Sequence, residues 1–303
     1  MVRSNVDPRE ASRTRSLALQ LFAGLSFVFA SLLLLAGCVG SLSSTAEASK
    51  EVRDATPKSL VILHTNDFHG HIAAESESAG AARIAAFFAS QRLQHDAVLV
   101  LDAGDAISGT PVSTLFSGEP IFEVMNVMGY DAGLIGNHEF DHGFRQIEKF
   151  RKASDHPLLA STAFAPDGSL VGDAPSVVLE RGGLRIGIIG VLTETTPNMI
   201  TPLGNEGTRF AEVESSLRSQ VGKLRDKVDV LVVLSHTGHK RELELAAAIA
   251  GIDVIVGGHS HSKVEEPVLV GSTIVAQAHE YGKAVGVLEL DVTDDVGVTL
   301  NLS

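Results

Sequence analysis

The sequence predicts an α/β fold in which β-sheets are packed in layers and helices cover their outer sides. From Lys58 onward, apolar runs of strand length alternate with amphipathic segments of helix length. Several of the apolar runs are almost continuous in Val, Leu and Ile, as expected for strands covered on both faces. The later runs are joined by short Gly-containing links, which are typical of hairpins. This mixture indicates layered sheets with helices outside.

The predicted elements follow one another along the chain without an internal repeat or a second domain boundary. Strands are expected at the apolar runs 60–64, 97–101, 132–135, 158–161, 184–191, 230–234, 254–256, 273–276 and 285–291. Helices are expected at the amphipathic segments 79–94, 120–128, 144–153, 212–227 and 241–250.

Composition limits the classes of function. The chain has 303 residues, 44% of them hydrophobic and 20% charged, which suits one large domain or two small ones. Its single Cys excludes a disulfide framework within the chain. The formal charge of −13 argues against a nucleic-acid polymer as partner, because such proteins neutralise phosphates with clustered Lys and Arg. A small anionic substrate stays compatible with this charge if bound cations reverse the local field.

The N-terminus has the layout of an export signal, with basic residues before an apolar run at 17–36. The run ends in Leu35-Ala36-Gly37-Cys38, which resembles the lipobox of bacterial lipoproteins. That resemblance implies a signal peptide at 1–37, a lipidated Cys38, a Ser-, Ala- and Thr-rich tether at 38–57 and a domain at 58–303. Ordinary signal cleavage and an uncleaved membrane anchor are the alternatives. Each exports the domain, and we expect a membrane-anchored lipoprotein of the bacterial cell envelope, periplasmic or on the outer surface.

Five polar blocks each follow an apolar run, where a strand would hand over to a loop. The blocks are Asp67-Phe68-His69, Gly104-Asp105, Gly136-Asn137-His138-Glu139-Phe140-Asp141, Ser235-His236 and Gly257-Gly258-His259-Ser260-His261. Oxygen and imidazole ligands converging on one sheet edge can hold two divalent metals side by side. Such a pair can ionise a bridging water and clamp a phosphate ester during in-line displacement. The blocks therefore predict a two-metal phosphoesterase.

The residue types suit this chemistry. Asp67 and His69 could face one cation if the local backbone is extended, and Gly104 allows a sharp turn that presents Asp105 as a bridging carboxylate. Asn137 adds a neutral oxygen, which keeps the site from becoming too anionic to release phosphate. Imidazoles favour Zn, Mn, Fe or Co over Mg or Ca, and they come from His236, His259 and His261.

A second pair of residues is suited to proton transfer. His138, held by the carboxylate of Asp141, is a natural general acid for the leaving group, and it could equally stabilise charge on the phosphoryl group. These two roles stay open. Glu139 is expected to shape the loop, and His71 and His239, which lie near the site loops, could touch substrate.

Together the five blocks resemble those of the calcineurin-like metallophosphoesterases, and more narrowly the 5′-nucleotidase and UDP-sugar hydrolase branch. The resemblance covers roughly residues 58–290 and includes the neighbouring segments 109–111, 123–126 and 129–132. It implies a four-layer α-β-β-α sandwich with the metals at the strand ends. It also implies one metal held by Asp67, His69, Asp105 and His261, a second held by Asp105, Asn137, His236 and His259, and a catalytic dyad of His138 and Asp141.

Relatives in this branch usually carry a second, C-terminal domain that binds the nucleoside, whereas this sequence ends after the first. We therefore expect a broad phosphoesterase, a partner chain that completes the substrate pocket, or a truncated gene product. The expected substrate is a small phosphate ester, such as a nucleotide or related metabolite. A thiosulfohydrolase on the same scaffold and a surface binding protein without turnover are the alternatives. Export and the acidic surface disfavour a DNA-repair nuclease.

Overall fold

The computed structural model describes residues 57–294 and 297–301. All of these residues belong to one compact unit. The predicted signal peptide at 1–37, Cys38 and the tether as far as residue 56 lie outside the described residues. Within the described part of the chain, no helix combines the length and the apolar character needed to cross a bilayer.

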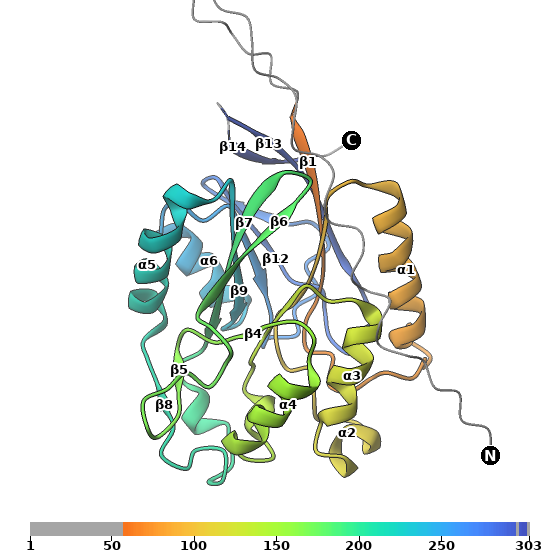
Figure 1. Cartoon of the computed structure of the whole chain (residues 1–303), viewed down its shortest axis with the longest axis vertical. Helices are drawn as coiled ribbons and strands as arrows, with labels where there is room; N and C mark the ends of the chain where they lie inside the picture. Colours follow the sequence, from red (N-terminus) through yellow and green to blue (C-terminus); the bar gives the residue numbers. More distant parts are fainter. Residues whose placement is uncertain (1–56, 295–296, 302–303) are drawn as a thin grey trace, which may run out of the picture. The chain divides into compact units, whose positions relative to one another are not determined.

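Two six-stranded mixed sheets form the centre of the described unit (Figure 1). The first sheet has the order β14 (Gly297–Leu300), β13 (Gly286–Thr293), β1 (Lys58–Thr65), β2 (Val98–Asp102), β3 (Ala132–Leu134), β4 (Leu158–Leu159). The second has the order β11 (Val268–Val270), β12 (Thr273–Ala276), β10 (Val254–Gly257), β9 (Val230–His236), β7 (Leu184–Leu192), β6 (Ser176–Arg181). A small two-stranded sheet pairs β5 (Ala163–Phe164) with β8 (Arg209–Phe210).

Helices flank the sheets (Figure 1). The α-helices are α1 (Gly80–Gln94), α2 (Pro111–Leu115), α3 (Glu119–Met128), α4 (Ile147–Ala153), α5 (Val213–Leu224) and α6 (His239–Ala248). Single 3₁₀ turns are η1 (His138–Phe140), η2 (Phe144–Gln146), η3 (Thr196–Asn198) and η4 (Arg225–Lys227).

Strand alternation creates three apolar cores. In β1, Leu60 and Ile62 pack between the two sheets, whereas Val61 and Leu63 pack on the opposite face with the helices α1, α3 and α4. The outer face of the second sheet packs in the same way against α5 and α6, around Leu217 and other apolar side chains. The layers are therefore helices, sheet, sheet, helices, and apolar side chains are buried on both faces of each six-stranded sheet.

The predicted α/β class with two sheets is confirmed, and most predicted elements are present within a few residues of the expected bounds. The sequence missed the edge strands β6, β11 and β14, both strands of the small sheet, β5 and β8, and the five-residue helix α2. β6 leaves its side chains half-buried or exposed, so its apolar pattern is weak. Two hairpins are present, β11–β12 and β13–β14, each formed by a predicted strand with a strand that was not predicted. The predicted neighbours β10 and β12 pair in parallel, so the hairpin expectation is wrong for these two strands.

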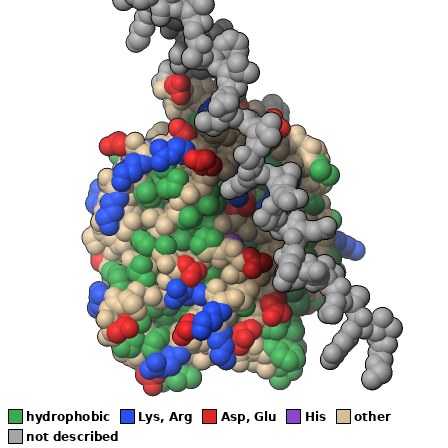
Figure 2. Space-filling model, viewed as in Figure 1, with side chains coloured by type: hydrophobic (Ala, Val, Ile, Leu, Met, Phe, Trp, Pro, Cys, Tyr) green, Lys and Arg blue, Asp and Glu red, His purple; other side chains and the backbone are tan. Residues whose placement is uncertain are grey.

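The described surface carries charges of both signs. In the lower part of the face shown in Figure 2, Lys and Arg side chains are interspersed with Asp and Glu side chains. Ion pairs between such groups include Arg151 with Asp173 at 2.7 Å and Lys152 with Glu148 at 2.7 Å. Pairs this exposed contribute little to stability.

Candidate metal centre

The polar blocks meet because their strands are parallel. β1, β2 and β3 run parallel in the first sheet, and β9 and β10 run parallel in the second. Parallel strands bring their carboxyl ends to one edge, where ligands gather in open α/β sheets. The nine predicted site residues follow or end these strands: Asp67 and His69 after β1, Asp105 after β2, Asn137, His138 and Asp141 after β3, His236 in β9, and His259 and His261 after β10.

The backbone at this edge is left-handed at five of the predicted ligand positions. The φ angles are +50° at Asp67, +50° at His69, +56° at Asp105, +74° at His259 and +52° at His261. A left-handed conformation costs an L-residue about 1–2 kcal/mol, and such residues cluster at functional sites. The backbone at Asp67 and His69 is not extended, which was the condition considered for both to face one cation. Two left-handed residues around the buried Phe68 turn both side chains toward the site instead.

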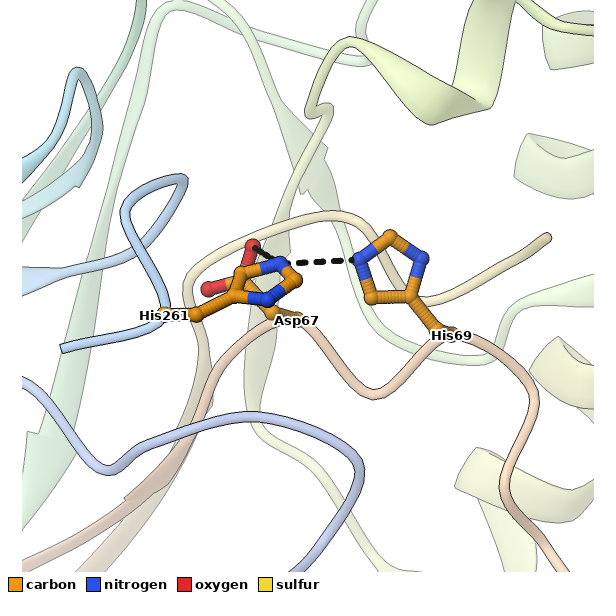
Figure 3. Close-up of side chains that lie close together, drawn as sticks. All are labelled: Asp67, His69 and His261. Carbon is orange, nitrogen blue, oxygen red and sulfur yellow. Dashed lines mark hydrogen bonds and ion pairs between the residues drawn. The ribbon is translucent and has the colours of Figure 1, made fainter. Parts of the chain in front are cut away.

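The first ligand cluster consists of Asp67, His69 and His261, drawn in Figure 3. The Nε2 atoms of His69 and His261 lie 3.2 Å apart, and His261 Nε2 lies 3.4 Å from Asp67 Oδ1. The backbone N–H of His259 donates to both carboxylate oxygens of Asp67, at 3.1 and 3.0 Å. These contacts join the loop after β1 to the loop after β10.

The second ligand cluster consists of Asp105, His236 and His259. His236 Nε2 lies 2.9 Å from Asp105 Oδ2 and 3.2 Å from the side-chain oxygen of Asn137. The other ring nitrogen, Nδ1, is 2.8 Å from the carbonyl oxygen of Ala103. When His236 is neutral and Nδ1 carries its proton, the Nε2 lone pair faces Asp105 and Asn137, which is the arrangement usual for metal-binding imidazoles.

Charge is concentrated in this second cluster. Burial alone would lower the pKa of His236, but the Asp105 carboxylate outweighs burial and raises the pKa to about 10. Burial would likewise raise the pKa of Asp105, yet the neighbouring His236 lowers it below its ordinary value. Asp105 is therefore a carboxylate in a buried position that is stable only beside positive charge.

His69, Asp105 and His138 form a third cluster that joins the first two, because it shares one residue with each. His138 Nδ1 lies 2.7 Å from Asp141 Oδ2, and Ser108 Oγ donates to the same oxygen at 2.6 Å. The hydrogen bond with Asp141 is the main cause that raises the pKa of His138 to about 9. His138 is thus an imidazolium at neutral pH, with its ring centroid 4.8 Å from that of His69.

Glu139 shapes the loops, as its position in the sequence predicts. Its buried carboxylate accepts hydrogen bonds from the backbone N–H groups of Gly136 and Asp105, at 2.6 and 3.1 Å, and of Ala106 and Ile107, at 2.9 and 3.3 Å. The loops after β2 and β3 are therefore fixed to each other.

Sequence reasoning missed three polar or aromatic residues of the site. Asn66 donates to Asp67 Oδ2 at 2.6 Å, Gln277 donates to the carbonyl of Gly258 at 2.8 Å, and the Tyr281 ring lies against the rings of His69 and His261. Gln277 directly follows β12, so the signal that found the other blocks was present there. The predicted substrate contacts, His71 and His239, lie beside the site: His71 stacks on Tyr281, and His239 lines a cavity with His259.

The residues present fit divalent metals. Within each cluster, the donor atoms lie within 4.8 Å of one another. Imidazole nitrogens with carboxylate and amide oxygens are ligands typical of Zn, Mn, Fe and Co. Adjacent clusters with a shared carboxylate between them are suited to two ions side by side.

Comparison with known proteins places this geometry in a family. The sequence pattern of the calcineurin-like phosphoesterases matches residues 60–263. The chain belongs to that family. It is 32% identical to bovine 5′-nucleotidase over 274 residues, which are 78% of this chain and 47% of the bovine protein.

Two bacterial relatives are similar to this chain to the same degree. It is 31% identical to the trifunctional nucleotide phosphoesterase protein YfkN of Bacillus subtilis, over 79% of this chain and 18% of YfkN. The crystal structure of a 5′-nucleotidase precursor from Thermus thermophilus superposes with a TM-score of 0.70 at 31% identity, over 80% of this chain and 53% of that one. The chain thus spans about half the length of the bovine and Thermus proteins, or less in the case of YfkN.

Proposed function

We propose that this phosphoesterase hydrolyses phosphate esters of nucleotides with two divalent metal ions. The observation that carries the proposal is the continuity of the three ligand clusters, in which His69 belongs to the first and third and Asp105 to the second and third. A single structural metal needs about four ligands, whereas this edge brings together seven candidate ligands and an acid–base pair.

The side chains divide into two sets around Asp105. Asp67, His69 and His261 would hold one ion together with Asp105, and Asn137, His236 and His259 would hold the other together with the same carboxylate. Two ions held there would lower the pKa of a coordinated water and offset the negative charge of the phosphoryl oxygens.

His138 is suited to act on the leaving group. Its imidazolium, held by Asp141, can donate a proton to the departing ester oxygen, or can stabilise charge on the phosphoryl group without transfer. The backbone N–H of His138 donates to Asp105 Oδ1 at 2.8 Å, so the position of the imidazolium is tied to the shared carboxylate.

Nucleotides are the substrate class that the relatives support. Bovine 5′-nucleotidase and the Bacillus subtilis nucleotide phosphoesterase are named for nucleotide substrates. A cavity of about 430 Å³ opens beside His259 and is also lined by His239, Lys240 and Arg241. This cavity offers space for a substrate group that extends beyond the phosphate.

The test is turnover by the purified full chain loaded with Mn²⁺, Co²⁺ or Zn²⁺. The substrates are a nucleoside monophosphate panel, a cyclic nucleotide, nitrophenyl phosphate and a sulfur ester. Metal-dependent release of phosphate is expected, with loss of roughly a hundredfold or more in His138→Ala at unchanged metal content. His95→Ala, a histidine outside the site blocks, is the matched control. Absence of phosphate release from every ester refutes the proposal, and turnover of the sulfur ester alone supports the thiosulfohydrolase alternative.

We also propose export and lipid anchoring through residues 1–37 and Cys38, based on the basic and apolar N-terminal pattern. Mass spectrometry of the mature chain from membranes should show a lipid-modified Cys38, and Cys38→Ala should release the protein from the membrane fraction. An unmodified Cys38 in a membrane-bound chain contradicts lipidation.

A partner chain that completes the substrate pocket is a separate proposal. If such a partner exists, KM for nucleotides should be lower in membrane extracts than for the purified chain.

A further inference from the structure

The loop between β12 and β13 contacts both loops that carry the first ligand cluster. Its residues Gln277–Lys283 are here called the 277–283 segment. The Gln277 side chain donates to Gly258 O at 2.8 Å and accepts from Ser262 N at 2.5 Å, on either side of His259 and His261.

The same segment is bound to the loop after β1. Asn66 Oδ1 accepts from the N–H of Ala278 at 2.7 Å, and Asn66 Nδ2 donates to the carbonyl of His279. The N–H of Tyr281 donates to the carbonyl oxygen of Asp67 at 2.8 Å. The 277–283 segment therefore joins the two loops that supply Asp67, His69 and His261.

Tyr281 brings an aromatic ring to this junction. Its ring centroid lies 5.4 Å from that of His69 and 5.5 Å from that of His261, with interplanar angles of 72° and 75°. His71 stacks on the Tyr281 ring at 4.4 Å, and the Lys283 amino group lies 5.3 Å from its centroid. Edge-to-face contacts of this kind restrict ring rotation and are worth about 0.5–1.5 kcal/mol each.

We propose that the Tyr281 ring is a positioning element for the first ligand cluster: it holds the imidazoles of His69 and His261 in the orientation that binds a divalent cation. The inference rests on the proposed metal site. The Nε2 atoms of the two imidazoles already lie 3.2 Å apart, as needed for two ligands aimed at one point. Rotation of either ring would move one nitrogen away from the other.

The contribution of the ring is separable from that of the backbone. Tyr281 is only partly buried, so the ring does not fill a core position. Its hydrogen bond to Asp67 uses the backbone N–H, a donor that the Phe, Ala and Leu variants keep. Among the described contacts, the Tyr281 hydroxyl makes no hydrogen bond, so Tyr281→Phe keeps every ring contact and is the matched control.

The experiment measures Co²⁺ binding by the metal-free full chain, using calorimetry and metal analysis after dialysis. The wild type and Tyr281→Phe should each bind two ions. Tyr281→Ala should bind one of the two about 10- to 100-fold more weakly, the usual effect of losing a residue that supports a metal ligand. Tyr281→Leu keeps apolar volume without a ring and should bind Co²⁺ as weakly as Tyr281→Ala. It replaces the Ala variant in the experiment if that variant does not fold.

Two backgrounds show which ion is affected. In His259→Ala, where the first cluster is intact, Tyr281→Ala should weaken the remaining site. In His261→Ala, where the second cluster is intact, Tyr281→Ala should change Co²⁺ affinity by less than about twofold, because coupling is expected only between contacting residues. Equal affinities for wild type, Ala and Leu variants overturn the inference. A wild type that binds no Co²⁺ refutes the proposed function itself, which is a distinct result.

Discussion

The carboxylate of Glu139 gives the sharpest stability prediction. It is fully buried and accepts hydrogen bonds from four backbone N–H groups, two on each oxygen: three belong to the loop after β2 and one to the loop after β3. Glu139→Gln keeps the shape of the side chain but replaces one oxygen by an NH₂ group, which cannot accept. Two backbone donors then lose their acceptor in a buried position.

Each buried donor left unsatisfied costs roughly 1–3 kcal/mol, so Glu139→Gln should lower the free energy of unfolding by about 2–6 kcal/mol. Urea denaturation followed by circular dichroism measures this change. Co²⁺ affinity should fall as well, because one of the bonds positions the backbone N–H of Asp105.

Glu123→Gln is the matched control, since Glu123 lies on α3 with an exposed side chain. Its free energy of unfolding should stay within about 0.5 kcal/mol of the wild type. If Glu139→Gln is equally neutral, the argument that this carboxylate joins the two loops is refuted.

Three further predictions concern protonation, packing and metal. Burial lowers the pKa of His156 to about 4, so on acidification the unfolded chain binds a proton before the folded chain does. The free energy of unfolding should therefore fall by about 3 kcal/mol between pH 6.5 and pH 4. His156→Leu should remove this part of the pH dependence in urea denaturation at several pH values, and an unchanged pH dependence contradicts the prediction. Gly257→Ala should lower the free energy of unfolding by about 1–3 kcal/mol in the same assay, because the added Cβ would lie 2.0 Å from a Glu242 oxygen. The control Gly222→Ala on α5 adds a Cβ that meets nothing within 4 Å, and it should raise the free energy of unfolding by about 0.5–1 kcal/mol. A Gly257→Ala variant more stable than Gly222→Ala would be inconsistent with the packing. Chelation of the metal should abolish turnover and lower the melting temperature. If metal was present at 100 times its Kd, its removal should lower the free energy of unfolding by about 2.7 kcal/mol. A chelated protein with full activity excludes metal from the reaction.

The candidate site could be located from the sequence because its residues follow apolar strands. Asp105 lies three residues after the end of β2, and His259 and His261 follow β10, so strand recognition and residue type together indicated this sheet edge. Gly104 has a φ of +88°, and a Cβ on it would lie 3.0 Å from the backbone nitrogen of Gly136, in agreement with the expected sharp turn.

Other features depend on three-dimensional contacts that no local pattern reveals. The left-handed backbone of Asp67 and His69 is enforced by hydrogen bonds from their N–H groups to the carbonyls of Gly104 and Asp105, at 2.9 and 3.0 Å. The edge strand β6 has one neighbour in its sheet and a half-exposed pattern, so its apolar signal is weak. Tyr281 resembles an ordinary loop residue until the fold brings it to His69, more than two hundred positions earlier in the chain.

The most direct test of the metal centre is anomalous diffraction at the cobalt edge from crystals of the full chain grown with Co²⁺. Two peaks a few ångströms apart should flank the carboxylate of Asp105, one beside His69 and His261 and the other beside His236 and His259. No peak at this sheet edge, or a single peak away from Asp105, would contradict a two-metal centre.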